Sequence, residues 1–224
     1  MLIREYMTPK PVTVRPESDF LAAVAILKAA RFHSLPVVTA GGELVGIVTD
    51  KDLAAASPPS VDELQPRKPD YFGVHLTVGQ VMNPDFVAIE SDVPLEEAAL
   101  LMLQKRVDRL LIVQGSALIG IITYTDVFRQ LVAILGGGSS AIRLTVEVKH
   151  APGQLAMLAS AIAAVGGNIA SVATARATQG RLMLTMRIEQ VGWPTLQQTL
   201  ADLSAVKIIH VCGKTEGCAG DAGD

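Results

Sequence analysis

The sequence contains two versions of one short motif, Gly46-Ile47-Val48-Thr49-Asp50-Lys51-Asp52 and Gly120-Ile121-Ile122-Thr123-Tyr124-Thr125-Asp126. The second version lies at a shift of 74 residues from the first, position 120 against position 46. Farther upstream the shift is 75, because Met7-Thr8-Pro9 recurs as Met82-Asn83-Pro84. A single one-residue gap reconciles the two halves, which indicates that roughly the first 130 residues are an internal duplication.

Each copy has the pattern of strand, helix, strand, strand, helix. In the first copy we expect strands at 12–14, 35–38 and 44–48, a helix over 18–31 and a second helix from Thr49. In the second copy we expect strands at 87–89, 110–113 and 118–122 and a helix over 94–105. One unit of about 50 residues buries little surface, so the two should pack sheet to sheet as a pseudo-twofold pair. Such a pair offers two related clefts, one for each repeat.

Two interpretations of the Thr-x-x-Asp pairs stay open. A helix N-terminus suits phosphate, so the hydroxyls of Thr49 and Thr123 could bond a phosphate oxygen. Asp52 and Asp126, one turn later, could then accept hydrogen bonds from both ribose hydroxyls. The same spacing is also a variant of the capping box, which needs no ligand.

The two motifs also differ in the residues around these pairs. Gly46 and Gly120 could let the backbone approach a ligand closely. Lys51 supplies a cation beside the first motif, whereas Tyr124 and Thr125 at the second do not. We therefore expect the first motif to be the better phosphate site.

The repeated Gly-h-x-Thr-x-x-Asp motif (h apolar) closing a βαββα unit resembles the CBS domain pair, over residues 1 to about 132. The resemblance implies an adenine nucleotide, either AMP, ADP, ATP or S-adenosylmethionine, as a regulatory ligand in the clefts. It also implies that the adenine lies near residues of both repeats: Thr13, His33, Leu35 and Pro36 in the first, and Ala88, Arg109 and Leu110 in the second.

A third segment follows the flexible joint Gly136-Gly137-Gly138-Ser139-Ser140. Its pattern from Ile142 onward predicts βαββαβ, a ferredoxin-like topology. The runs Pro152-Gly153-x-Leu155 and Gly167-Asn168-Ile169 resemble those of an ACT domain, whose two loops contact an amino acid at a dimer interface. The implied site comprises His150, Pro152, Gly153, Gln154, Leu155, Asn168 and Ile169. His150 stands where the family usually has an acid, so a domain that only dimerises stays an open alternative, and its edge strands invite pairing with a second chain.

The expected fold class is therefore α+β, with tandem βαββα repeats and a C-terminal ferredoxin-like domain. The expected boundaries are 1–56 for the first repeat, 57–77 for a linker with a short helix near 61–64, 78–135 for the second repeat, 136–141 for the joint, 142–212 for the ACT-like domain and 213–224 for a disordered tail.

The composition excludes several classes of function. With a net charge of −3, 4% aromatic residues and no run of Lys or Arg, the chain lacks the electrostatic pattern of a nucleic-acid-binding protein. No apolar stretch reaches the ~20 residues that a bilayer requires, and the first residues lack the long apolar run of a signal peptide, so we expect neither a membrane span nor a signal peptide. The two cysteines, Cys212 and Cys218, both lie near the C-terminal end and are not spread through the fold, so we expect a cytoplasmic protein.

No catalytic function is expected, because the sequence offers neither a nucleophile–base pair nor histidines at metal-ligand spacing. A CBS pair followed by an ACT domain resembles the bacterial acetoin-utilisation regulatory protein family. The resemblance implies a regulatory role in acetoin or acetyl-CoA metabolism. We expect a ligand sensor that forms a homodimer and whose target could be an enzyme. The alternative is a dimerisation scaffold without a small-molecule ligand.

Overall fold

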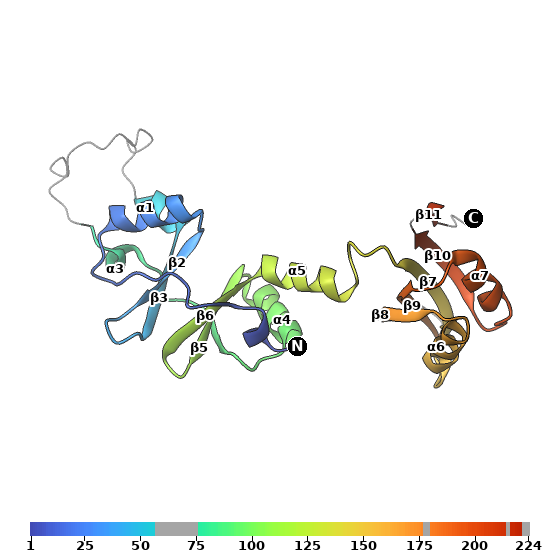
Figure 1. The fold of residues 1–224 in the computed structure, drawn as a ribbon. Coiled ribbons are helices and arrows are strands. Elements are labelled where there is room, and N and C mark those ends of the chain that lie inside the picture. Colours follow the sequence, from blue (N-terminus) through green and yellow to red (C-terminus); the bar gives the residue numbers. More distant parts are fainter. Residues whose placement is uncertain (57–75, 177–179, 214–215, 221–224) are drawn as a thin grey trace. The chain divides into compact units, whose positions relative to one another are not determined.

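The computed structural model describes residues 1–56, 76–176, 180–213 and 216–220 (Figure 1). These divide into two compact units, Met1–Phe128 and Arg129–Asp224. The helix expected near 61–64 lies outside the described residues. Among the described residues, no helix combines the length and apolar character needed to cross a membrane.

The first unit contains both repeats. The first repeat consists of η1 (Ile3–Glu5), β1 (Thr8–Pro9), α1 (Phe20–Ala30), β2 (Ser34–Val38), β3 (Leu44–Thr49) and α2 (Asp50–Ala56). The second consists of α3 (Val78–Val81), β4 (Ala88–Glu90), α4 (Leu95–Lys105), β5 (Arg109–Gln114), β6 (Ala117–Thr123) and α5 (Tyr124–Ile134), which continues into the second unit.

The strand expected at 12–14 is wrong. Of these residues only Val14 pairs, through an isolated parallel bridge to Val37, whereas the equivalent segment of the second repeat forms the strand β4 parallel to β5. Three β-branched residues supply β-propensity, but a strand also needs a partner along its whole length. The first strand of the chain is instead β1, nearer the N-terminus.

The two repeats exchange their Met-x-Pro segments. β1 pairs antiparallel with β6 of the second repeat, with Thr8 opposite Ile121. In the symmetric arrangement, Asn83 of the second repeat bridges Ile47 on β3. The sheet of each repeat is therefore extended at one edge by a segment that belongs to the other repeat.

Apolar packing holds the two repeats together. Each has its own core, one around Phe20, Leu27 and Leu35 and the other around Leu95, Leu110 and Ile112. A further cluster joins the two sheets through Leu44, Ile47 and Leu111. The expected sheet-to-sheet packing of a duplicated βαββα unit is thereby confirmed.

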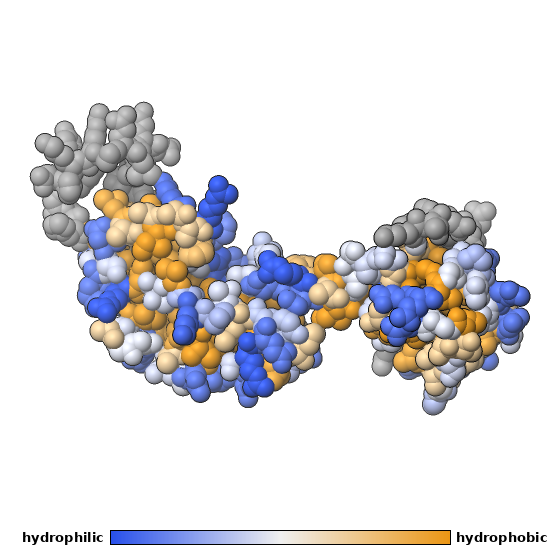
Figure 2. Space-filling view, in the orientation of Figure 1, coloured by the Kyte–Doolittle hydropathy of each residue, from blue (hydrophilic) through white to orange (hydrophobic). Residues whose placement is uncertain are grey.

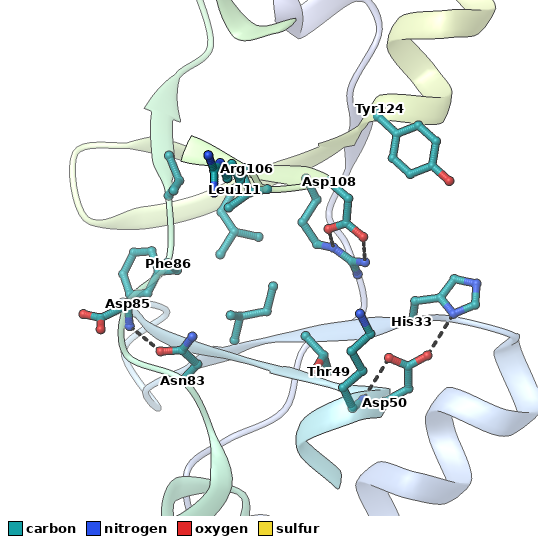
Figure 3. A pocket seen from close by; sticks show the side chains of 15 residues that line it. His33, Thr49, Asp50, Asn83, Asp85, Phe86, Arg106, Asp108, Leu111 and Tyr124 are labelled. Carbon is teal, nitrogen blue, oxygen red and sulfur yellow. Dashed lines mark hydrogen bonds and ion pairs between the residues drawn. The ribbon is translucent and has the colours of Figure 1, made fainter. Parts of the chain in front are cut away.

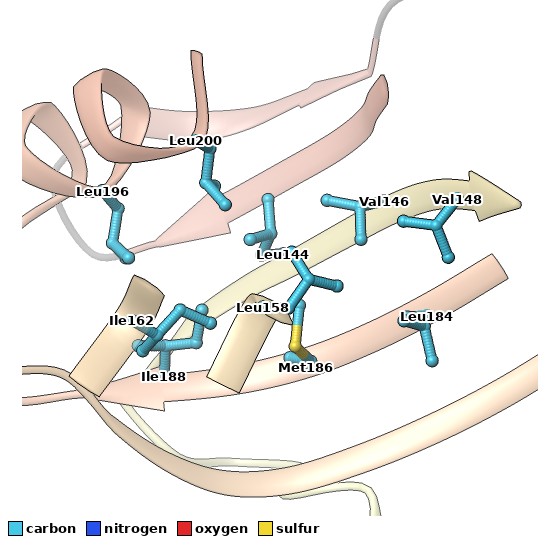
Figure 4. Close-up of a cluster of buried hydrophobic side chains, with 10 residues drawn as sticks. All are labelled: Leu144, Val146, Val148, Leu158, Ile162, Leu184, Met186, Ile188, Leu196 and Leu200. Atoms are coloured by element: carbon cyan, nitrogen blue, oxygen red, sulfur yellow. The ribbon is translucent and has the colours of Figure 1, made fainter. Parts of the chain in front are cut away.

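The second unit has the predicted ferredoxin-like order. It consists of β7 (Ile142–Lys149), α6 (Gln154–Ala164), β8 (Asn168–Arg176), β9 (Arg181–Glu189), α7 (Trp193–Ala201), β10 (Lys207–Gly213) and β11 (Glu216–Gly220). The antiparallel sheet runs β11-β10-β7-β9-β8. Side chains from one face of β7 and β9 pack against Leu158 and Ile162 of α6 and against Leu196 and Leu200 of α7 (Figure 4).

The tail differs from the expected disorder. Glu216–Gly220 forms β11 and pairs antiparallel with β10, with His210 opposite Gly220. A Gly-rich composition predicted no structure there, but the open edge of β10 supplies backbone partners that composition does not register. The described sheet therefore has β11 and β8 as its two edge strands.

Candidate ligand clefts

Two clefts lie between the repeats of the first unit. We name them the Lys51 cleft, with a volume of about 580 Å³, and the Lys10 cleft, with a volume of about 460 Å³. The Lys51 cleft is lined by the start of α2 together with residues that precede and begin the strands of the second repeat (Figure 3). The Lys10 cleft is lined by the start of α5 together with the equivalent segments of the first repeat.

Each cleft is thus built from both repeats. The two clefts are related by the duplication as expected, but neither belongs to one repeat alone. The physical reason is the exchange of Met-x-Pro segments. Because Asn83 lies against β3, the chain that follows it forms a wall beside Thr49, and the chain that follows Thr8 forms a wall beside Thr123.

The Thr–Asp pairs form two capping boxes. The backbone N–H and the hydroxyl of Thr49 both donate to Oδ2 of Asp52, at 2.8 and 2.7 Å, and the N–H of Asp52 donates back to Thr49 Oγ1 at 3.2 Å. Thr123 and Asp126 repeat these bonds at 2.9, 2.7 and 3.3 Å. The threonines line the clefts, whereas neither aspartate is among the lining residues. The geometry therefore matches the capping interpretation, and contact with ribose stays a prediction.

The other residues expected to bind nucleotide fall into two groups. Pro36 and Lys51 each line one cleft, and His33 and Arg109 line both. Four expected residues line neither cleft. Leu35 and Leu110 are wholly buried in the cores, and at Thr13 and Ala88 a neighbouring residue takes the lining position. In the last two cases the lining residues are Val12 and Val87.

The two motif glycines contact the exchanged segments. A Cβ atom at Gly46 would lie 2.8 Å from the sulfur of Met82 and 3.1 Å from the carbonyl oxygen of Asn83. At Gly120 it would meet Met7 and the carbonyl oxygen of Thr8. These glycines therefore admit a second backbone at the sheet edge, and the expected close approach is to protein and not to a ligand.

The two clefts share a polar wall, to which the expected residues His33 and Arg109 both belong. Four residues line both clefts: His33, Asp108, Arg109 and Tyr124. The guanidinium of Arg109 binds Asp108 through two bonds of 2.7 and 2.6 Å and also donates to the Ser34 hydroxyl of the other repeat. Beside this wall, Nδ1 of His33 lies 3.1 Å from Oδ2 of Asp50.

These bonds shift two carboxyl groups in the same direction. The hydrogen bond from His33 holds the pKa of Asp50 below its ordinary value, with a smaller contribution from the backbone N–H of Lys51. The hydrogen bond from Arg109 likewise lowers the pKa of Asp108. Both groups are therefore carboxylates at neutral pH.

Two arginines were missed by sequence reasoning. Arg31 and Arg106 follow α1 and α4 in the left-handed conformation, with φ of 53° and 55°, and each lines a different cleft. Glycine is the usual residue at such a helix end, so an arginine there costs free energy at two equivalent positions. The repeat itself carried this signal, since Arg31 and Arg106 coincide at the shift of 75.

The expected amino-acid site is divided within one chain. The loop at His150, Pro152, Gly153, Gln154 and Leu155 lies where β7 ends, because the His150 N–H donates to the carbonyl of Gly180 at the start of β9. Asn168 and Ile169 lie at the opposite end of the sheet, opposite Glu189 and Ile188 where β9 ends. The 11 residues of α6 separate the two loops by about 16 Å.

One atom of the first loop lacks a partner. Oε1 of Gln154 is buried and accepts no hydrogen bond from any described residue. Elsewhere in the described chain, no group of three or more His, Cys, Asp or Glu side chains is arranged to hold a metal ion.

Comparison with known proteins gives matches over both units. The CBS domain model matches residues 3–58 and 78–133, and the TTHA0829-like ACT domain model matches residues 137–211. A CBS domain-containing protein of Dictyostelium discoideum is 31% identical over 137 residues, which is 60% of this chain and 94% of that protein. An inosine-5'-monophosphate dehydrogenase of Methanocaldococcus jannaschii is 35% identical over 120 residues, but these are 53% of this chain and only 21% of the enzyme.

Two solved structures resemble the first unit. One is that of a Vibrio cholerae protein assigned to acetoin utilization (AcuB), with 25% identity, a TM-score of 0.51, and coverage of 61% of this chain and 93% of that one. The other is CBSX2, a protein of Arabidopsis thaliana, in complex with AMP, with 30% identity, a TM-score of 0.50, and coverage of 59% and 97%. The duplicated fold and both family matches lead to one conclusion: the chain belongs to the CBS domain family and carries a C-terminal ACT domain of the TTHA0829-like type.

Proposed function

We propose that the protein is a non-catalytic sensor that binds an adenine nucleotide in the clefts between its two repeats. The observation that carries this proposal is the matched construction of the clefts, each with an apolar strip beside a threonine and three cationic side chains. Their volumes of about 580 and 460 Å³ fall within the range typical of small-molecule sites. Support also comes from CBSX2, whose similar fold is solved with AMP.

The chemistry of the linings suits a nucleotide. In the Lys51 cleft, Ile47, Phe86 and Leu111 offer an apolar surface to a base. In the Lys10 cleft, Val12 and Pro36 do the same. Guanidinium groups bind phosphate through charge-assisted hydrogen bonds, and Arg109 is placed to serve either cleft.

The predicted roles of the Thr–Asp pairs remain part of the proposal. The capping bonds use only Oδ2 of Asp52, so the second carboxylate oxygen is not needed to hold the helix. A hydroxyl of a bound ribose could replace the Thr49 hydroxyl as a hydrogen-bond donor to Asp52 without unfolding the start of α2. Binding would then shift the balance between states of the chain and so bias a partner.

Binding is tested by calorimetry and thermal unfolding of the full chain with AMP, ADP, ATP and S-adenosylmethionine. We expect at least one of them to raise the melting temperature. Arg109→Met should weaken its binding by about tenfold or more, since a hydrogen bond to a charged group contributes about 1.5–3 kcal/mol. Arg4→Met, an exposed arginine outside both clefts, is the matched control. No shift with any of the four ligands would refute the nucleotide proposal.

The absence of catalysis is tested in the same preparation. Incubation with ATP or AMP should leave the nucleotide unchanged, as followed by chromatography. Sustained turnover that is lost in Arg109→Met would instead assign an enzyme to the clefts.

We further propose that an amino acid binds the C-terminal domain between two copies of the chain. The supporting observation is the separation of the two expected loops, which only a second chain can bring together. The unpartnered Oε1 of Gln154 could accept a hydrogen bond from the amino acid's ammonium group. Gln154→Met should abolish the thermal shift given by the active amino acid, whereas Gln197→Met, on the exposed part of α7, should retain it.

The pathway is proposed from likeness alone. Similarity to the Vibrio cholerae protein assigned to acetoin utilization suggests that the sensor regulates an enzyme of acetoin or acetyl-CoA metabolism in the cytoplasm. Deletion of the gene should then impair growth of its host on acetoin as a carbon source and leave growth on glucose unchanged. Equal growth on both would overturn this assignment.

A dimerisation scaffold is the second candidate, and one surface favours it. α5 exposes Tyr124, Phe128, Leu131 and Val132 at helical spacing, each 46–59% exposed. Figure 2 shows apolar surface over the later part of this helix. A second copy of the chain is the proposed occupant, because an apolar stripe is self-complementary across a twofold axis. Light scattering should show a dimer that Phe128→Ser with Leu131→Ser dissociates, whereas Leu103→Ser, an even more exposed apolar residue on α4, does not. A dimer that binds none of the ligands would favour the scaffold.

A further inference from the structure

The two clefts carry different charge although they are related by the duplication. Three cationic side chains line each of them: Lys51, Arg106 and Arg109 in one, and Lys10, Arg31 and Arg109 in the other. The Lys51 cleft also has three carboxylates, whereas the Lys10 cleft has only Asp108. The charges therefore balance in the Lys51 cleft and leave an excess of two positive charges in the Lys10 cleft.

Two substitutions between the repeats favour the Lys10 cleft by three charges, and a third, Lys51 where the second repeat has Thr125, returns one of them. Asp85 of the second repeat stands where the first repeat has Lys10, at the shift of 75. Asp50, the first residue of α2, stands where α5 begins with Tyr124, at the shift of 74. Each aspartate lines the Lys51 cleft, and each counterpart lines the Lys10 cleft.

The hydrogen bonds of Asp50 reinforce the contrast. Its Oδ1 accepts the backbone N–H of Lys51 at 2.9 Å, and its Oδ2 accepts from His33. Two donors that face the Lys51 cleft are thus already satisfied by a carboxylate of the protein. At the start of α5, Tyr124 has no carboxylate to offer Thr125, so a ligand oxygen meets no such competitor.

We infer that the Lys10 cleft is the site for a di- or triphosphate group, and that the Lys51 cleft accepts a nucleoside or a zwitterionic ligand of low net charge. This inference rests on the proposed nucleotide function and names the ligand class of each cleft. It reverses the sequence-based preference for the first motif as the phosphate site. Lys51 does line its cleft, but the three carboxylates of that cleft balance its three cationic side chains.

The test exchanges the charges at equivalent positions. Lys10→Asp and Asp85→Lys both change exposed residues, and aspartate tolerates the left-handed backbone of position 10, where φ is 48°. The probes are inorganic triphosphate, ATP and AMP, titrated by calorimetry into the full chain at low and at high salt. Circular dichroism of each variant checks that it is folded.

We expect Lys10→Asp to weaken binding of inorganic triphosphate and ATP by about tenfold or more at low salt, and AMP by less. High salt should reduce the difference. Asp85→Lys should leave the first triphosphate site intact and add a second. If Lys10→Asp binds triphosphate with an affinity within twofold of the wild type, the inference is overturned, but the proposed nucleotide binding is not. Triphosphate binding that depends on Lys10 in a chain that binds no adenosine ligand would instead overturn the proposed function alone.

Discussion

Replacement of Gly46 by alanine tests whether the exchanged segment lies against β3 as the structure has it. The new Cβ would lie 2.8 Å from the sulfur and 3.3 Å from Cγ of Met82, and 3.1 Å from the carbonyl oxygen of Asn83. A flexible methionine can move away from the first two contacts. The backbone oxygen cannot, because the Asn83 N–H and carbonyl are both hydrogen-bonded to Ile47, at 2.8 and 3.0 Å.

The magnitude follows from two opposing effects. Inserting a methyl group into a close-packed contact costs typically about 1–3 kcal/mol. Replacing glycine by alanine also reduces the conformational entropy of the unfolded chain, which returns about 0.4–1 kcal/mol. We therefore expect Gly46→Ala to lower the free energy of unfolding of the first unit by about 1–2 kcal/mol. For a unit of this size the melting temperature should fall by roughly 4 °C per kcal/mol.

Chemical denaturation followed by circular dichroism measures the loss. Gly41→Ala is the matched control, because its Cβ would meet only Thr39 Oγ1 at 3.7 Å and should change the stability by less than about 0.5 kcal/mol. The double variant Gly46→Ala with Met82→Ala should lose about the sum of the two single changes, since the methionine can move away and the Asn83 carbonyl oxygen remains the obstacle. Equal stability of Gly46→Ala and Gly41→Ala would refute the exchanged arrangement.

Three further outcomes are expected. Leu158→Ala removes a fully buried side chain between α6 and the sheet and should lower the free energy of unfolding of the second unit by about 3–5 kcal/mol. The fluorescence of Trp193, the only tryptophan of the chain, should follow this unfolding. A loss of less than about 1 kcal/mol would contradict the described core. Asp52→Ala and Asp126→Ala should each cost about 1 kcal/mol in the absence of ligand, as capping residues do, and no measurable change in urea denaturation would argue against the capping boxes. His33→Ala should raise the pKa of Asp50 toward its ordinary value, as measured by NMR titration of the carboxyl carbon. An unchanged pKa of Asp50 in this variant would contradict the His33 bond. Because the pKa of Asp50 is depressed in the folded state, Asp50 stabilises the fold above the ordinary carboxyl pKa. This contribution is lost as the pH falls through the folded pKa.

The sequence alone determined the duplication and the fold class. The equivalence of Gly46 with Gly120 and of Thr49 with Thr123 follows from letters and spacing, and so do the helix starts at these threonines. The ferredoxin-like order of the second unit follows in the same way, because alternation and turn residues are local signals. These features depend on neighbours within a few residues along the chain.

Tertiary structure decided which segments meet. The pairing of Thr8 with Ile121 and of Asn83 with Ile47 joins residues far apart in sequence, and no local pattern states which strand edge a segment will occupy. That pairing builds each cleft from both repeats, moves the motif glycines against protein backbone, and brings Asp85 into the lining of the same cleft as Lys51. The charge of a cleft is the sum over side chains gathered from separate segments, so it could be known only once the edges of the two sheets had been assigned.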